Sequence, residues 1–291
     1  MLDEYATTHP WLRVFHKSNG GVSSARNLAL DQIEADGSFE YLSFVDPDDW
    51  VSPNFLQDFI EAALKHDADY VVCGYNQYTT KGMSNTWTMQ YPYCVLDRKG
   101  IAEHYFNIGA WSGNSSSTCR MMCSRMFKSS IVAGLRFDPK MPDAEDQLYT
   151  ITAMKRLSNG VHLPNQNYQY RLRKSSLSHH KGKGIAHEFS SMLNLASDTA
   201  FDQSVREGIK KSLADIWWQA LKESYSTNDQ DLRKTCLDMM PRFKTEEYSE
   251  ILPRRSHKRF LIADLGETAL RIYFFFRGNK NPTKKQDDYF P

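Results

Sequence analysis

Two kinds of apolar pattern alternate along the first part of the chain. Apolar side chains recur at helical spacing from Val22 to Ala35 and from Phe55 to Leu64. Shorter apolar runs at Leu12–His16, Tyr41–Val45 and Asp69–Cys73 have the length and the aromatic or β-branched content of strands. This alternation of strands and helices predicts an α/β layer architecture.

Turn and capping residues set the expected ends of these elements. Gly37 suits the exit of the first helix, because glycine readily takes the left-handed conformation at a helix C-terminus. Ser52 and Pro53 predict the start of the second helix, with Ser52 as its cap and Pro53 at its first position.

The rest of the chain changes from mixed to helical. Residues 74–97 predict antiparallel strands or a long excursion, and 98–108 predict a helix. Two further strands are expected at 161–163 and 168–173, and three helices at 185–203, 205–224 and 229–249. Trp217 and Trp218 are expected in the core or at an interface rather than at a cofactor. We therefore divide the chain into an α/β domain at 1–180, a helical region at 181–252, and a basic, aromatic-rich helix with a polar, disordered tail at 253–291.

Charge and cysteine content narrow the function classes. The 291 residues carry 36 basic and 35 acidic side chains, so a general nucleic-acid-binding surface is not indicated. Residues 253–291, however, hold nine Lys or Arg against four acids. These cations, together with the aromatic residues of the segment, predict that 254–280 contacts an anionic membrane surface. Packing of this segment on the domain or on a partner is the alternative. Five cysteines without a dense framework, and no signal peptide or membrane span, predict a cytoplasmic protein.

Three carboxylates follow the strand at Tyr41–Val45. Asp46, Asp48 and Asp49 surround Pro47, which ends the strand and fixes the turn. The carboxyl end of a strand is where open α/β sheets bind ligands, and clustered carboxylates suit a divalent cation. A solvated acidic turn is the alternative.

Gly20 and Gly21 precede the first helix, where backbone N–H groups are available to an anion. Arg26, in the first turns of that helix, adds a fork of donors. Further along, Arg171 and Arg173 share one face of a strand and could clamp phosphate, although a solvated surface is the default.

Asp143, Glu145 and Asp146 gather where the pattern predicts the start of a helix. Acids at this position are stabilised by the helix dipole, which is the simpler interpretation. The functional interpretation is a general base aimed into a cleft. His179 and His180 follow the strand at 168–173, and we interpret them as exposed loop residues rather than metal ligands.

Three segments together resemble the family 2 inverting glycosyltransferases with a GT-A fold, a Rossmann-like mixed sheet flanked by helices. They are Asn19–Asp31, the segment Phe44–Trp50, which resembles a metal-binding D-x-D motif, and Arg136–Asp138 leading to Glu145–Leu148. Their order and spacing agree over residues 11 to 180, and Tyr170–Ser178 follows at a familiar distance.

The resemblance implies a role for each candidate residue. Asp48, with Asp46, would bind Mn²⁺ or Mg²⁺ on the diphosphate of a nucleotide-sugar. Asp46 would otherwise contact the ribose or sugar, and Asp146 would act as general base with Glu145 orienting it. The residues expected to hold the donor nucleotide and its diphosphate are Gly20, Gly21, Arg26, Asn27, Arg171 and Arg173.

Members of the family open with a strand-helix-strand unit that Met1–Pro10 does not contain. We expect about 50 to 60 residues of that unit to be missing, the size of a crossover and its next strand. We therefore expect an N-terminally truncated enzyme that transfers a sugar, with a UDP-sugar as the expected donor, to a glycan or lipid-linked acceptor. The alternatives are an inactive remnant that binds nucleotide or glycan, and another metal-dependent nucleotide enzyme.

Overall fold

Two mixed β-sheets and the helices around them form the molecule in the computed structural model, which describes residues 1–87, 92–108, 121–174, 184–245, 248, 250, 252, 254–278 and 289–290. The five-stranded sheet has the order β1-β7-β3-β8-β6, formed by Tyr41–Ser43, Arg125–Lys128, Tyr70–Val72, Asn159–His162 and Cys94–Asp97. The four-stranded sheet has the order β2-β9-β4-β5, formed by Trp50–Val51, Tyr168–Arg171, Tyr75–Thr79 and Gly82–Trp87.

Parallel and antiparallel pairs occur in both sheets. β3 runs parallel to β8, with Val71 opposite Val161, and antiparallel to β7. β9 runs parallel to β4 and antiparallel to β2, where Trp50 lies opposite Gln169. The pairing confirms the mixed sheet, and β4 and β5 confirm the antiparallel strands expected in residues 74–97.

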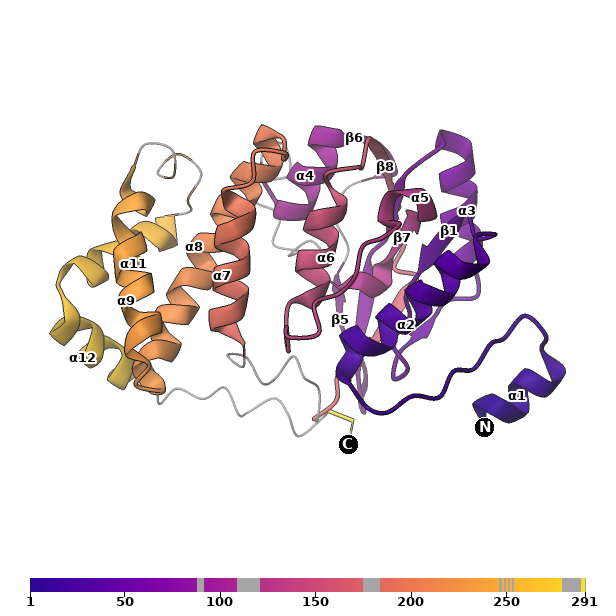
Figure 1. Cartoon of the computed structure of the whole chain (residues 1–291), viewed down its shortest axis with the longest axis horizontal. Helices are drawn as coiled ribbons and strands as arrows, with labels where there is room; N and C mark the ends of the chain where they lie inside the picture. Colours follow the sequence, from indigo (N-terminus) through magenta and orange to yellow (C-terminus); the bar gives the residue numbers. More distant parts are fainter. Residues whose placement is uncertain are drawn as a thin grey trace.

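Helices cover the sheets and continue beyond them (Figure 1). The helices before residue 160 are α1 (Leu2–Thr8), α2 (Gly21–Asp36), α3 (Phe55–His66), α4 (Arg98–Phe106), the 3-10 turn η2 (Met122–Ser124), α5 (Ser129–Val132) and α6 (Glu145–Ala153). After them come α7 (Ile185–Ala196), α8 (Gln203–Ser226), α9 (Gln230–Met239), the 3-10 turn η4 (Met240–Lys244), α11 (Arg254–Asp264) and α12 (Glu267–Gly278).

Alternate side chains of the central strands separate into two apolar clusters. Tyr70 and Val72 of β3 belong to the cluster that also contains helices of the C-terminal region, whereas Val71 belongs to the cluster that contains Phe55 and Phe59 of α3. Successive residues of a strand point to opposite faces, so this is the expected result for a sheet covered on both sides.

Three local expectations were wrong. Leu12–His16 is not a strand, because no neighbouring strand supplies ladder partners to it in the described residues. The run at Tyr41–Val45 forms a strand only as far as Ser43, at the edge of its sheet, and Val45 is 50% exposed. Finally, α3 begins at Phe55, because Ser52 accepts the Phe55 N–H in a turn and donates its hydroxyl to Asn167 instead of capping the helix.

The helical region shares its core with the α/β part. Trp217 of α8 is fully buried, donates its indole N–H to the Cys236 carbonyl at 2.7 Å, and belongs to the same cluster as Tyr70. Close contact is possible because α8 carries Gly208, where an added Cβ would lie 2.0 Å from Cδ2 of Phe106 on α4. Trp217 and Trp218 are thus core residues, as expected. The proposed boundary at residue 180 stays a prediction.

None of the helices in the described part of the chain combines the length and the apolar character needed to cross a bilayer.

Candidate functional site

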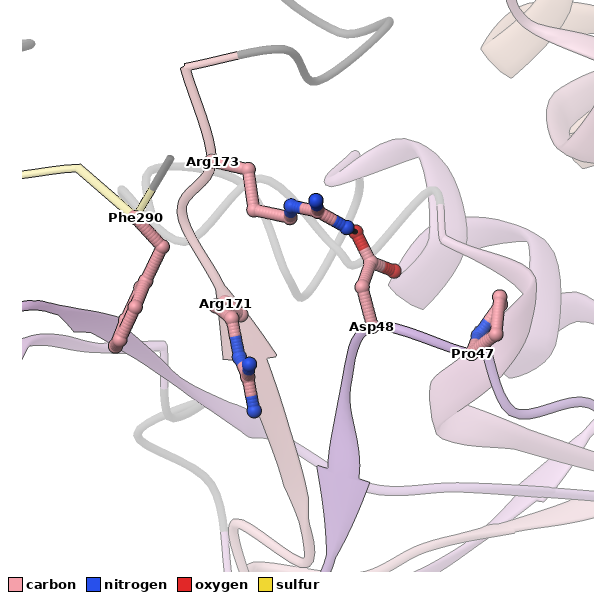
Figure 2. A pocket seen from close by; sticks show the side chains of 5 residues that line it. All are labelled: Pro47, Asp48, Arg171, Arg173 and Phe290. Carbon is pink, nitrogen blue, oxygen red and sulfur yellow. Dashed lines mark ion pairs between the residues drawn. The ribbon is translucent and has the colours of Figure 1, made fainter. Parts of the chain in front are cut away.

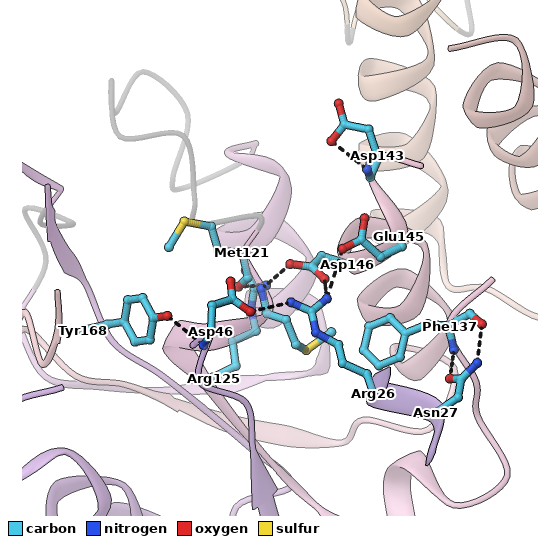
Figure 3. Close-up of polar contacts among 12 residues, drawn as sticks. Arg26, Asn27, Asp46, Met121, Arg125, Phe137, Asp143, Glu145, Asp146 and Tyr168 are labelled. Atoms are coloured by element: carbon cyan, nitrogen blue, oxygen red, sulfur yellow. Dashed lines mark hydrogen bonds and ion pairs between the residues drawn. The ribbon is translucent and has the colours of Figure 1, made fainter. Parts of the chain in front are cut away.

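Arg26 is the centre of an ion-pair cluster that joins three parts of the chain (Figure 3). Its Nη2 donates to Oδ1 of Asp46 at 3.0 Å, and its Nη1 donates to Oε1 of Glu145 at 3.0 Å and to Oδ1 of Asp146. The Arg26 side chain is 10% exposed and lies 5.1 Å from the ring centre of Phe137. Helix α2 therefore brings the acidic turn and the Glu145–Asp146 pair to one place.

The charges in this cluster alter the pKa of its members. Burial lowers the pKa of Arg26, but the charges of Asp146, Asp46 and Glu145 outweigh burial and raise it above its usual value. Burial, together with the adjacent Asp146 charge, raises the pKa of Glu145 to about 8 in spite of the opposing Arg26 charge. The raised pKa thus favours the protonated form of Glu145.

Asp146 is fixed from two sides. Its Oδ1 accepts from Arg26, and its Oδ2 accepts the backbone N–H of Met122 in η2 at 2.8 Å. Glu145 and Asp146 form the first turn of α6 and follow Ala144, whose φ of 67° is uncommon for a residue other than glycine. The start of α6 confirms the predicted element, and its contacts hold the carboxylates at the cluster rather than in open solvent.

The three aspartates of the acidic turn point to different partners. Asp46 contacts Arg26, and Oδ2 of Asp48 lies 3.6 Å from Nη1 of Arg173. Asp49 accepts the Tyr168 hydroxyl at 2.5 Å and the Arg171 N–H at 2.8 Å. Burial raises the pKa of Asp49 to about 6, although both hydrogen bonds oppose the shift. Asp49 fixes the turn to β9, and only Asp46 and Asp48 are available to a ligand.

A cavity of about 480 Å³ opens beside this turn (Figure 2). Its lining consists of Pro47, Asp48, Arg171, Arg173 and Phe290. Arg171 and Arg173 therefore reach the same space, as their period-two spacing predicts. The polar groups of this lining, two guanidiniums and one carboxylate, suit a diphosphate with a bound cation.

The carboxylates fit a metal that arrives with its ligand. In the residues that the structure describes, no three His, Cys, Asp or Glu side chains are arranged to hold a metal ion. Asp48 and Asp46, however, are 35% and 34% exposed, and Mg²⁺ is commonly held by one or two carboxylates together with substrate phosphates. His179 and His180 lie outside the described residues, as do residues 109–117.

Gly20, Gly21 and Asn27 lie near the cluster without joining it. Gly21 begins α2 with a φ of 80°, and both glycines are exposed. Asn27 exchanges two hydrogen bonds with the backbone of Phe137, at 2.8 and 2.9 Å. Asn27 thus fixes the Phe137 segment to α2, and the ligand contacts expected of these three residues stay a prediction.

Sequence reasoning missed several residues of the site. Tyr168 contacts both Asp46 and Asp49, and Phe290 lines the cavity, although the last residues were expected to be disordered. The main chain of Met122 was also missed. The two aromatic residues come from an ordinary strand pattern and from a polar tail, and a backbone N–H has no sequence signal at all.

The acidic turn and the acidic start of α6 are both part of an α/β fold. This fold is similar to that of known structures. The fold resembles that of residues 1–349 of TarS from S. aureus in complex with UDP-GlcNAc, with a TM-score of 0.56 and 14% identity over 98% of this chain and 76% of that 1–349 chain. The molecule therefore has the mixed α/β fold of the GT-A glycosyltransferases.

Sequence comparison relates part of the chain to a known family. Residues 1–131 match the family described as glycosyl transferase family 2. The uncharacterized glycosyltransferase EpsJ of Bacillus subtilis (strain 168) is 29% identical over 186 residues, which are 61% of this chain and 50% of EpsJ. The glycosyltransferase GlyG of Streptococcus pneumoniae serotype 4 is 23% identical over 249 residues, 81% of this chain and 79% of GlyG. Residues 1–131 are thus similar to glycosyl transferase family 2, and the chain spans about half the length of EpsJ.

Proposed function

We propose that this chain transfers a sugar from a nucleotide-diphosphate sugar to a hydroxyl of a glycan or lipid-linked acceptor, with inversion at the anomeric carbon. The observation that carries the proposal is the Arg26 cluster, which places the acidic turn and the Glu145–Asp146 pair around one guanidinium. The glycosyltransferase relatives and the UDP-GlcNAc complex of TarS support this class of reaction and a UDP-sugar as donor.

The donor diphosphate would lie in the cavity beside the acidic turn. Arg171 and Arg173 would bind its phosphate oxygens, and Asp48, with Asp46, would hold Mn²⁺ or Mg²⁺ against them. When bound, the cation neutralises charge that develops on the departing diphosphate. Gly20, Gly21 and Asn27 would contact the nucleotide from the side of α2. Arg26 would support Asp46 there rather than bind the nucleotide itself, because its donors already contact carboxylates.

Asp146 would remove the proton from the acceptor hydroxyl as that oxygen attacks the anomeric carbon and the bond to the diphosphate breaks. Each of its oxygens accepts one hydrogen bond from the described residues, and a carboxylate oxygen can accept a second. Glu145, whose raised pKa favours the protonated form, would orient Asp146 and not compete with it as base. Arg26 would keep Asp146 ionised and aimed.

The engagement of both Asp146 oxygens is the observation that favours the alternative, a protein that binds donor or glycan without turnover. Incubation with UDP-, GDP- and dTDP-sugars, Mn²⁺, and simple glycoside or lipid-linked acceptors separates the two. Released nucleoside diphosphate supports sugar transfer, and released pyrophosphate would instead indicate a nucleotidyltransferase. Donor binding without any release would identify the binding protein.

The metal is tested separately by calorimetry of UDP binding. Mn²⁺ should strengthen UDP binding to the wild type, and Asp48→Asn should remove that gain. Asp143→Asn is the matched control, because Asp143 lies beside the same cluster but hydrogen-bonds only to the N–H of Ala144 in the described structure. An undiminished Mn²⁺ effect in Asp48→Asn would contradict the assignment.

We also propose that 254–280 contacts the inner face of the cell membrane. Exposed apolar side chains lie on both α11 and α12, namely Leu261, Leu265, Ile272, Phe275 and Phe276. Lys258 and Arg271 are exposed on the same two helices. Apolar side chains flanked by cations are the composition that binds anionic interfaces, where a lipid-linked acceptor would be found.

A further inference from the structure

Arg171 lies between two aromatic rings on one face of the four-stranded sheet. Its guanidinium carbon is 5.3 Å from the ring centre of Trp50 and 5.0 Å from that of Phe290. Trp50 in turn lies 4.7 Å from Tyr78 between ring centres. Both distances from Arg171 are within the range of cation–π attraction.

Strand register explains why these side chains meet. Trp50 pairs with Gln169, two residues before Arg171, so the side chains of Trp50 and Arg171 are on the same face. Phe290 pairs with Arg173 in a parallel bridge, which places its ring on that face too. Figure 2 shows Phe290 beside Arg171, with Asp48 and Arg173 across the cavity.

Residues 289–290 pair with the end of β9 through backbone hydrogen bonds. Leu172 donates its N–H to Tyr78 of β4 and accepts the N–H of Phe290 at 2.9 Å, and Lys174 donates to the Phe290 carbonyl at 2.8 Å. The segment thus takes a place alongside the end of β9, next to where β4 ends. Two backbone hydrogen bonds and one stacked ring define the position of Phe290.

We propose that Phe290 is a positioning residue for the donor diphosphate: together with Trp50 it holds Arg171 in the orientation that binds phosphate. This inference rests on the proposed function. Both rings lie within cation–π distance of the guanidinium, and Arg171 itself lines the cavity where the diphosphate would bind. Among the described residues, Nε of Arg171 is buried without a hydrogen-bond partner, so the stack and not a carboxylate orients this side chain.

Substitutions at Phe290 test the stack through UDP affinity, measured by calorimetry with Mn²⁺. Phe290→Leu keeps an apolar side chain and removes the aromatic ring, and it should weaken UDP binding about 5-fold, as expected for one cation–π contact. Phe290→Tyr should restore affinity, because tyrosine also attracts a cation. If acceptor turnover is measured, the donor KM should rise with kcat unchanged.

A matched control is available at Phe39, whose ring centre lies 5.8 Å from the guanidinium carbon of Arg13 outside the cavity. Phe39→Leu should leave UDP affinity unchanged. The effect should also depend on Arg171, so that Phe290→Leu added to Arg171→Ala causes no further loss. An equal loss in both backgrounds would overturn the proposal.

Docking of the segment is measured without ligand by hydrogen exchange at the amides of Phe290 and Lys174. Slowed exchange at both amides supports the position described, and exchange at the rate of an unstructured chain overturns it.

Tighter UDP binding by Phe290→Leu would show that the ring competes with the donor, which also overturns the proposal. Wild-type protein that binds none of UDP, GDP and dTDP would overturn the proposed function as well, whereas binding that ignores Phe290 overturns this inference alone.

Discussion

Arg26 donates to Asp46 at 3.0 Å from a side chain that is only 10% exposed. The bond connects α2 to the acidic turn, and the other terminal nitrogen of Arg26 connects the same helix to α6. One cation thereby compensates carboxylates from two distant segments of the chain.

Removal of this cation should destabilise the fold. Arg26→Ala leaves Asp46, Glu145 and Asp146 together without their shared cation, and loss of one partner from a buried ion pair typically costs about 3–5 kcal/mol. Urea denaturation of the variant measures the loss. Arg13→Ala is the control, because the exposed Arg13–Asp36 pair should contribute no more than about 1 kcal/mol. Equal losses in the two variants would contradict a central role for Arg26.

Substitution of Asp146 should lower kcat far more than substitution of Glu145. Asp146→Asn removes the proposed base and should lower kcat by a factor of about 10² or more, the usual contribution of general base catalysis. Glu145→Gln resembles the protonated side chain that the raised pKa favours, so its kcat at pH 7 should fall much less. Steady-state kinetics of donor consumption distinguish them. A larger loss in Glu145→Gln would assign the base to Glu145.

The raised pKa of Glu145 also predicts a pH-dependent stability. Its pKa rises from an ordinary 4.5 to about 8 in the fold, so the native state binds more protons between these values. The free energy of unfolding contributed by Glu145 therefore falls as pH increases through this window. Glu145→Gln should remove that fall, most clearly from pH 6 to 8, above the pKa of about 6 for Asp49.

Glu34→Gln is the control for this experiment. Hydrogen bonds from Arg136 and Gly134 lower the pKa of Glu34 to about 2, so its contribution changes only below pH 4.5. Denaturation curves at a series of pH values should show a constant difference between this variant and wild type above that pH. A flat wild-type profile from pH 6 to 8 would contradict the assignment for Glu145.

Membrane contact should depend on exposed side chains of α12. Phe275→Ser with Phe276→Ser should reduce flotation with anionic vesicles and leave the fold intact, because these residues are 69% and 70% exposed. Deletion of the helices is a poorer test, since Leu270 and Phe274 are buried against the core that contains Trp218. Leu56→Ser on α3, at another exposed apolar position, is the control. Unchanged flotation of the double variant would contradict the proposal.

Sequence predicted the features that depend on neighbours along the chain. Helix α2 and its end at Gly37, which has a φ of 68°, follow from apolar spacing and from the freedom of glycine. The acidic start of α6 and the shared face of Arg171 and Arg173 follow equally from local periodicity.

What sequence could not predict depends on tertiary contacts. The partners of Arg26 lie 20, 119 and 120 positions away, and nothing near Arg26 marks it as the centre of a cluster. The separate directions of the three aspartates depend on where α2 and β9 lie, because Asp46 contacts Arg26 whereas Asp48 and Asp49 contact residues of β9 and its end. Phe290 reaches the cavity only because its backbone forms a parallel bridge with Arg173, which follows β9.

The contact between Gly208 and Phe106 limits how this chain can be recombined with its relatives. A chimaera that keeps α4 and takes α8 from another chain needs a residue without a side chain at this crossing, because even a methyl group would overlap the Phe106 ring. Exchange of α8 between relatives therefore requires the matching α4 as well.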